Sequence, residues 1–253
     1  MSFPKIRAIT LRIIETCGIE APPVPLEPIL ERFRARVVES GHIPESALMR
    51  SDGGWTIRVN RELREERRAF RIAHEIAHIY WSHPDNHQGD PTLGGKLEHY
   101  CSKFASLLLC PHQWFVKDAP AADHDLARLK ELYGNVSHEA LAIRLSFVTP
   151  MVVTIFDSGE LYRRFSSPGL GHPPDGQQVE MEIRQQVDIY GKFREQAGSI
   201  KWGGTNRSVR VRGYPVFSGK FRRIILLTTP AGDGGAHDDP DYEEDMPYPF
   251  PEY

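Results

Sequence analysis

The sequence has few cysteines, a small net charge and no long apolar run. Its 253 residues include three cysteines, Cys17, Cys101 and Cys110, an odd and sparse set that excludes the disulfide framework of a small secreted protein. No apolar stretch approaches the roughly 20 residues that a membrane-spanning helix needs. The first residues, Met1 to Arg7, are not followed by the apolar core of a secretory signal. We therefore expect a cytoplasmic protein without membrane attachment.

The net charge of −3 hides an asymmetry along the chain. Residues 231–253 contain eight acidic residues and no Lys or Arg. Without those eight, 26 acidic residues remain against 31 basic ones, so residues 1–230 carry a charge of +5. The body has the 40% hydrophobic content of a globular protein, whereas the acidic, proline-containing tail is predicted to be disordered.

Hydrophobic periodicity predicts alternating helices and strands in the first 150 residues. Apolar positions at helical spacing predict helices over 4–17, 26–33, 62–81, 97–109, 126–133 and 138–146. Alternation of apolar and polar residues predicts strands at 35–38 and 55–59. The segment 82–95, with its prolines and glycines, is predicted to be a loop.

The pattern changes after Pro150. Two strand-like runs, 151–156 and 161–165, flank Asp157-Ser158-Gly159 and predict a hairpin. An amphipathic helix at 179–190 and two further strands complete a β-β-α-β-β segment, the strands lying at 208–216 and 221–229. About 80 residues of this kind can bury a core of their own.

The residues that indicate chemistry are His74-Glu75-Ile76-Ala77-His78, within the predicted helix 62–81. Residues four apart lie on one face of a helix, so both imidazoles can bind one metal ion. Glu75 would face a water on that metal, act as its general base and later pass the proton to the leaving amine. The pattern is short enough to occur by chance, so its surroundings must support it.

A catalytic zinc site needs a third protein ligand and an open fourth position. Glu98 lies at the start of the predicted helix 97–109, and the 19 residues between His78 and Glu98 suffice for a loop and a return. We therefore predict that His74, His78 and Glu98 bind Zn²⁺, a donor set known from catalytic zinc sites. The alternative is a structural zinc site with Cys101, one turn from Glu98, as fourth ligand. His83, His87 and His99 lie nearby, but the sequence assigns none of them a role.

Three ordered blocks resemble the ImmA/IrrE metallopeptidases. Arg67 to His78 is similar to the family's Arg/Gln-rich lead into Phe-Thr-Leu-Ala-His-Glu-x-x-His, and Glu98 to Pro111 is similar to Glu-x-x-Ala/Cys-x-x-Phe-Ala-x-x-Leu-Leu-Met-Pro. Val136 to Leu145 is similar to a Val-Ser-x-x-Ala-x-x-x-Arg-Leu helix. The chain departs from the family at Arg71, where Thr is usual, and at Cys110, where Met is usual.

The resemblance extends over about residues 5–150. It implies a gluzincin-like site and a protein substrate, often a helix-turn-helix repressor of the XRE type, and the best-known members add a C-terminal GAF-like sensor domain. We predict an α+β protein that cleaves such a repressor in response to a signal and so derepresses genes. Its predicted parts are a zincin-like metallopeptidase domain (1–120), a helical, helix-turn-helix-like extension (121–150), a GAF- or PAS-like sensor domain (151–230) and the acidic tail (231–253).

Two other functions remain open. One is a DNA-binding regulator with a structural zinc, although the predicted helix 138–146 offers only Arg144 as a firm cation, balanced by Glu139. We therefore expect this helix to pack against the protein and do not expect direct nucleic-acid binding. The other is a peptidase fold that has become a non-catalytic protein-binding module.

The arginine-rich segment 207–223 is a better surface for an anionic partner, or for the acidic tail, than the predicted helix 138–146. Alternating arginines nevertheless usually form the solvated face of a sheet.

Overall fold

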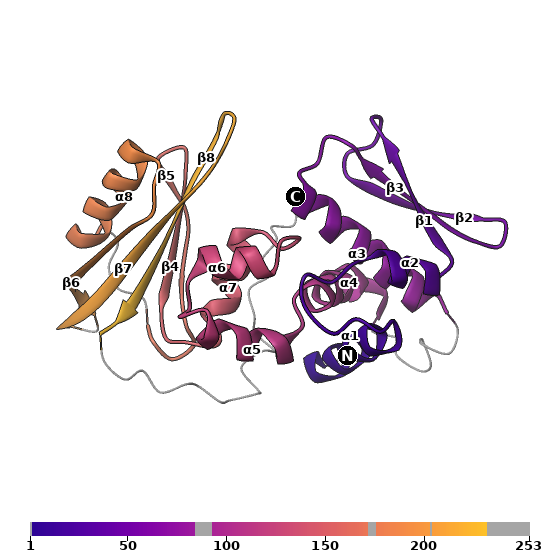
Figure 1. Ribbon diagram of the computed structural model, residues 1–253, viewed down its shortest axis with the longest axis horizontal. Helices are drawn as coiled ribbons and strands as arrows, with labels where there is room; N and C mark the ends of the chain where they lie inside the picture. The colour runs from indigo at the N-terminus through magenta and orange to yellow at the C-terminus, as the bar shows by residue number, and fades with distance from the viewer. Residues whose placement is uncertain (1, 84–92, 172–175, 203, 232–253) are drawn as a thin grey trace. The chain divides into compact units, whose positions relative to one another are not determined.

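The computed structural model describes residues 2–83, 93–171, 176–202 and 204–231 (Figure 1). The chain divides into two compact units. Among the described residues, unit 1 comprises 2–118 and 130–137, and unit 2 comprises 119–129 and 138–231. Most of the predicted loop, with His87, and nearly all of the acidic tail lie outside the described residues.

Unit 1 contains a three-stranded sheet in the order β1-β3-β2. Its strands are β1 (Ala35–Ser40), β2 (Ser46–Ser51) and β3 (Gly54–Asn60). The central strand β3 pairs in parallel with β1 and antiparallel with β2. Ile57 and Val59 of β3 are fully buried, as expected for the middle strand of a sheet that is covered on one face.

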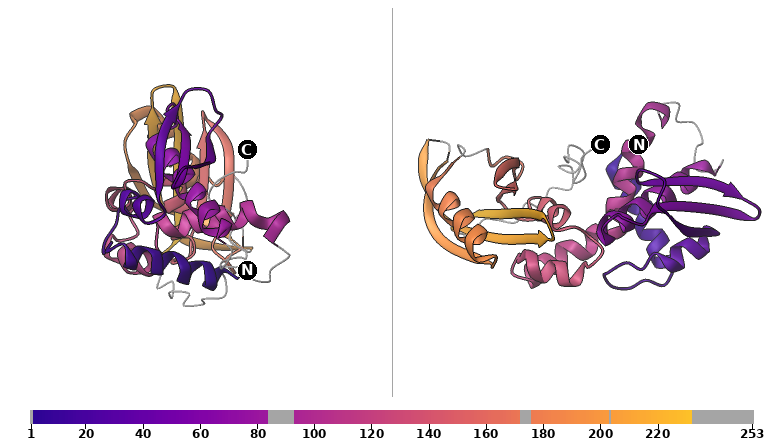
Figure 2. Two further views of the ribbon diagram at one scale, coloured as in Figure 1. Left: turned by 90° about the vertical axis from the view of Figure 1, so that its right-hand side faces the viewer. Right: turned by 90° about the horizontal axis from the view of Figure 1, so that it is seen from above.

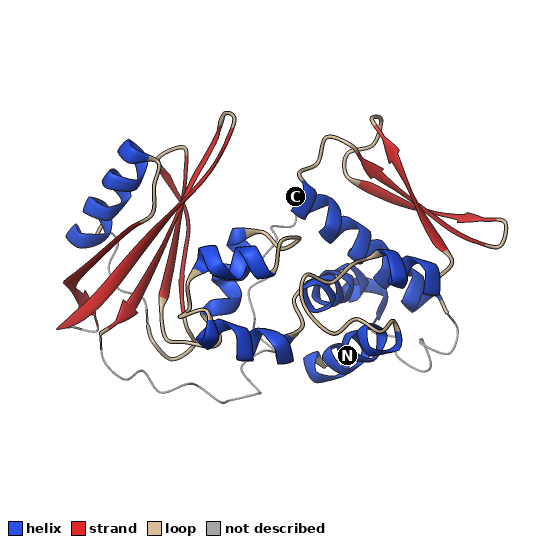
Figure 3. Ribbon diagram, in the orientation of Figure 1, coloured by secondary structure: helices blue, strands red, loops and turns tan. Residues whose placement is uncertain are grey.

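Helix α3 (Glu65–Ser82) covers that face (Figure 3). The other helices of this part of the chain are α1 (Phe3–Thr16), α2 (Glu27–Arg32), α4 (Leu93–Leu109) and α5 (His112–Ala121). Helix α3 packs against β2, β3 and α4, while α1 packs against α4 and α2 against β1. Small buried residues in the two central helices, Ala73 and Ala77 in α3 and Ala105 in α4, leave room for the larger side chains Phe70 and Phe104. The predicted helix 62–81 is thus confirmed as α3, and it is held at the centre of unit 1.

Unit 2 is built on a five-stranded sheet in the order β5-β4-β8-β7-β6. Helix α6 (Leu126–Leu132) begins in unit 2 and ends in unit 1. The other elements of unit 2 are α7 (His138–Leu145), β4 (Val152–Asp157), β5 (Glu160–Ser166), α8 (Gln178–Tyr190), β6 (Arg194–Trp202), β7 (Thr205–Ser218) and β8 (Phe221–Pro230). All the pairings are antiparallel. Helix α8 lies along one face of the sheet, against β6, β7 and β8 (Figure 2). Its Val179, Ile183 and Val187 join the buried core of that face.

The mixed α+β class and the predicted hairpin 151–165 are confirmed, but three elements were not predicted. These are β2, α5 and β6, and β6 changes the predicted β-β-α-β-β order to β-β-α-β-β-β. Residues Glu139 to Leu145 of α7 are all buried. Glu139 forms ion pairs with Arg163 and Arg223 of the sheet, so α7 packs within unit 2 as expected. None of the described helices is long and apolar enough to cross a bilayer.

The arginine-rich segment 207–223 is largely neutralised within unit 2. Arg212 pairs with Asp123 at 2.8 Å and with Glu195 at 2.7 Å, and only 11% of its side chain is exposed. Arg223 pairs with Asp157 at 2.6 Å and with Glu139. Paired and partly buried guanidinium groups offer an anionic partner little free charge, which weakens the interpretation of this segment as an anion-binding surface.

Candidate metal centre

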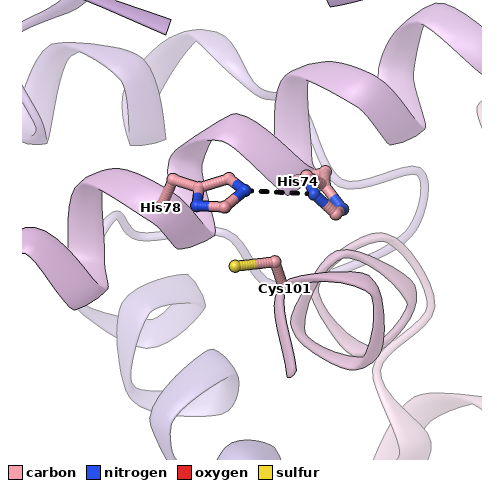
Figure 4. Close-up of side chains that lie close together, drawn as sticks. All are labelled: His74, His78 and Cys101. Carbon is pink, nitrogen blue, oxygen red and sulfur yellow. Dashed lines mark hydrogen bonds between the residues drawn. The ribbon is translucent and has the colours of Figure 1, made fainter. Parts of the chain in front are cut away.

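Helix α3 presents two imidazoles on successive turns. Its first turn carries Glu65 and Glu66, and the positive N-terminal end of the helix dipole stabilises their negative charges. Apolar residues at helical spacing bury its inner face. His74 and His78 both point from α3 toward α4 (Figure 4). His74 is 3% exposed, whereas His78 is partly exposed, so one imidazole is fixed by packing and the other borders solvent.

Glu98 of α4 meets both imidazoles. One carboxylate oxygen lies 3.0 Å from His74 Nε2, and the other lies 3.2 Å from His78 Nε2. The two Nε2 atoms are 3.2 Å apart. Donor atoms around a tetrahedral metal, at bond lengths of about 2.0–2.1 Å, are separated by roughly 3.3 Å. The two imidazole nitrogens have the spacing of neighbouring tetrahedral donors, and Glu98, which reaches each nitrogen with a different carboxylate oxygen, completes a three-donor face. The residues present fit a divalent metal that binds N and O donors.

The outer side of this face is open. The Glu98 side chain is 72% exposed and that of His78 is 23% exposed. A catalytic site needs such an opening because water and substrate must reach the fourth position.

Cys101 lies on the inner side of the centre. His74, His78 and Cys101 each have a potential donor atom, and these three atoms lie within 4.8 Å of one another. Cys101 is fully buried between α3 and α4. Burial raises the pKa of its thiol, and the carboxylates of Glu98 and Glu75 raise it further. Without a metal ion these surroundings keep Cys101 protonated, whereas a bound metal ion would itself favour the thiolate.

Ser102 orients His74 from the opposite side of the ring. Its Oγ lies 3.3 Å from His74 Nδ1. When Nε2 offers its lone pair to a metal, Nδ1 carries the proton. The Nδ1–H group then donates a hydrogen bond to Ser102 Oγ, which fixes the tautomer and the ring plane. Ser102 was not predicted, although its position four residues after Glu98 places it on the same helix face.

Glu75 is held by the first residue of β2. Ser46 Oγ donates a hydrogen bond of 2.6 Å to Glu75 Oε1, and Arg71 Nε donates one of 3.2 Å to Ser46 Oγ. Glu75 is only 7% exposed, so these contacts limit its rotation. Arg71, which departs from the family pattern, is thus linked to the predicted general base through Ser46, by two successive hydrogen bonds. Ser46 was not predicted as a site residue, because the strand to which it belongs, β2, was not predicted.

The remaining nearby histidines lie apart from the three-donor face. His83 is exposed at the C-terminal end of α3, and it lines a separate cavity of unit 1. His99 stands beside Tyr100 on α4, with the ring centroids 5.8 Å apart. The donors that the geometry brings together are His74, His78 and Glu98.

Part of the chain is similar to a known peptidase family. Residues 31–146 match the model of the IrrE N-terminal-like domain, a peptidase family. A solved structure described as a Mycobacterium tuberculosis transcriptional regulator is similar in fold, with a TM-score of 0.62 and 18% sequence identity over 89% of this chain and 76% of that one. Curated proteins gave no sequence match. The matched segment contains His74, Glu75, His78 and Glu98, so the similarity to the IrrE N-terminal-like peptidase domain includes every residue of the predicted centre.

Proposed function

We propose that the protein is a zinc-dependent endopeptidase. The observation that carries the proposal is the face formed by His74, His78 and Glu98, whose donor atoms lie 3.0 Å and 3.2 Å apart. Glu75 adjoins this face on the same helix. Two neutral imidazoles and one carboxylate are the donor set of a catalytic zinc site, whereas a structural site usually has four protein ligands, often cysteines.

Each residue has a distinct task in peptide hydrolysis. His74, His78 and Glu98 would hold the zinc ion, which when bound polarises the substrate carbonyl and lowers the pKa of a water ligand to near 7. Glu75 takes the proton of the attacking water and later returns it to the leaving amine. Ser46 and Arg71 limit the rotation of Glu75 and so keep its carboxylate ready for this transfer.

The free edge of β2 suits an extended peptide. In the described sheet, β2 pairs with β3 on one side only, and its first residue, Ser46, contacts Glu75. An extended segment can add to such an edge through main-chain hydrogen bonds, which do not depend on the peptide's sequence. A peptide bound there would pass beside Glu75, which supports a protein substrate with an accessible extended segment.

The resemblance to the ImmA/IrrE proteins suggests the identity of that substrate. We propose a helix-turn-helix repressor of the XRE type, cleaved in the cytoplasm when a signal reaches unit 2 acting as a GAF- or PAS-like sensor. The single antiparallel sheet of unit 2, with α8 across one face, is compatible with such a module. A small helix-turn-helix protein encoded beside this one would be the first substrate to test.

The deciding experiment compares wild type with Glu75→Gln. Each protein is incubated with the candidate repressor, the fragments are read by mass spectrometry, and bound zinc is measured separately. The variant should keep one zinc per chain and lose roughly 10²- to 10⁴-fold in cleavage rate, the usual contribution of a general base. Glu62→Gln, an exposed residue outside the centre, is the matched control. Undiminished cleavage by Glu75→Gln would refute the assigned role.

A transcriptional regulator with a non-catalytic zinc is the second candidate. The similar solved structure is described as a transcriptional regulator, and Cys101 is close enough to the imidazoles to be considered as a ligand. Cys101→Ala separates the two proposals in the same assays. The peptidase predicts unchanged zinc content and cleavage, while a four-ligand structural site predicts loss of zinc.

A further inference from the structure

A second concave site lies in unit 1, away from the metal centre. It is a cavity of about 1140 Å³ bordered by α1, α2, the turn between β2 and β3, and the C-terminal end of α3. Its lining does not include His74, His78 or Glu98. What this cavity binds is therefore independent of the function proposed above.

Positive charge dominates the cavity. Five cationic side chains line it, and no Asp or Glu is among the lining residues that the structure describes. These cations are Lys5, Arg12, Arg32, Arg34 and Arg50. Within the described parts of the chain none of the five forms an ion pair, in contrast to Arg212 and Arg223 of unit 2. Unpaired like charges around one concavity repel one another and raise the local concentration of anions.

Aromatic rings form another part of the wall. Phe33, Trp55 and Tyr80 line the cavity and are half-buried. Trp55 and Arg50 are cross-strand partners, and the Arg50 guanidinium lies 4.8 Å from the centre of the Trp55 ring. A planar cation over an indole ring is the kind of surface on which a flat heterocycle stacks, because both groups present broad faces.

The wall near Trp55 is shaped by the backbone. A Cβ on Gly54 would lie 2.1 Å from the carbonyl oxygen of Arg34, so only glycine allows this approach of the two chain segments. The Trp55 N–H donates a hydrogen bond of 2.9 Å to the same carbonyl. Trp55 and Arg34 are therefore held together by main-chain geometry, which makes this part of the cavity preformed.

We propose that this cavity binds a nucleotide carrying at least two phosphates. Several unpaired cations require a ligand with several negative charges, and the aromatic wall requires a planar ring in the same molecule. Inorganic polyphosphate has no ring, and an acidic peptide lacks closely spaced charges beside a flat heterocycle. The volume lies just above the roughly 300–1,000 Å³ typical of small-ligand sites, so a nucleotide fits it without needing a longer polymer.

Titration calorimetry of ATP binding to the full chain at low salt tests the proposal. Arg12→Glu and Arg50→Glu should each weaken ATP binding at least tenfold, because each replaces attraction by repulsion. Arg61→Glu makes the same charge change at an exposed position outside the cavity and should leave binding within about twofold. Trp55→Leu should weaken ATP binding but leave tripolyphosphate binding unchanged, and thermal melting of each variant verifies that it is folded.

Several results would overturn the proposal. They are no detectable binding of ATP at millimolar concentration, tripolyphosphate binding as tight as that of ATP, and an equal loss of binding in Arg61→Glu. Tight binding of a single-stranded oligonucleotide without binding of ATP would also overturn it, in favour of a nucleic-acid site. Adenosine alone should bind at least tenfold more weakly than ATP.

Discussion

Among the three predicted ligands, His74 is the most deeply buried, with 4% of its side chain exposed against 23% for His78 and 72% for Glu98. Burial lowers the pKa of His74 to about 4, and the positive charges of His78 and Arg71 act in the same direction. The imidazole is therefore neutral at physiological pH, so its Nε2 lone pair is available without loss of a proton.

The low pKa of His74 predicts how the stability of the metal-free protein depends on pH. In the unfolded chain this histidine takes up a proton below about pH 6.5, whereas in the folded state it does so only near pH 4. Between these values the unfolded state binds more protons, so the free energy of unfolding falls as the pH falls. The loss attributable to His74 is at most roughly 3 kcal/mol.

Urea denaturation at a series of pH values, with a chelator present, measures this dependence. Wild type should lose stability more steeply between pH 6.5 and 4 than His74→Gln, whose side chain does not titrate. Parallel curves for the two proteins would show that His74 is not the buried neutral group described here.

At the scale of elements, the packing of α8 on its sheet depends on two glycines. A Cβ on Gly198 of β6 would lie 2.8 Å from Val179 Cγ2. A Cβ on Gly213 of β7 would lie 2.6 Å from Ile183 Cγ2 and 2.8 Å from Val187 Cγ2. Because these α8 side chains are buried in the core of unit 2, they have no space into which to move. The glycines therefore set the distance between helix and sheet.

Gly213→Ala should consequently destabilise unit 2 by about 1–3 kcal/mol, the usual cost of overpacking a core. Gly134→Ala is a matched control, since a Cβ there meets no atom within 4 Å. It should be neutral or slightly stabilising, because alanine restricts the unfolded chain. Equal unfolding midpoints for the two variants in urea would contradict the close packing of α8.

The elements that the sequence failed to predict are those that depend on distant partners. Strand β2 contains Ala47, Leu48 and Met49, which have little preference for strands, and its register comes from pairing with β3. Strand β6 contains Gly198, and mostly polar residues face away from the core. Helix α5 contains Pro120, which interrupts a helical pattern. Local periodicity could not reveal any of the three.

The same distinction applies to the candidate site. His74 and His78 lie four apart on one helix, so their meeting was predictable from helix geometry alone. Glu98 was predictable from the need for a third ligand and the length of chain available. Ser46 was not predictable, because its contact with Glu75 depends on where the edge of an unforeseen strand meets α3.

At the scale of the whole molecule, charge is unevenly distributed. The eight acids of the C-terminal tail offset a body of charge +5 and give the net charge of −3. The cavity with five cations belongs to that body. An anion approaching the cavity therefore experiences both the local attraction and the mean field of the chain, which acts over about 30 Å at 0.01 M salt but about 8 Å at 0.15 M.

Removing residues 232–253 should therefore accelerate association of ATP with the cavity several-fold at 0.01 M salt, because the net charge changes from −3 to +5. The acceleration should disappear near 1 M salt, where the screening length is about 3 Å. Stopped-flow tryptophan fluorescence on wild type and the truncated chain measures both rates.

A third protein that keeps the tail's length but carries Asn and Gln in place of its eight acids is the matched control. It should associate as fast as the truncated chain if charge is the cause. A neutral tail that still slows association would show that the tail obstructs the cavity by its bulk, and equal rates for all three proteins would show that its charge does not reach the cavity.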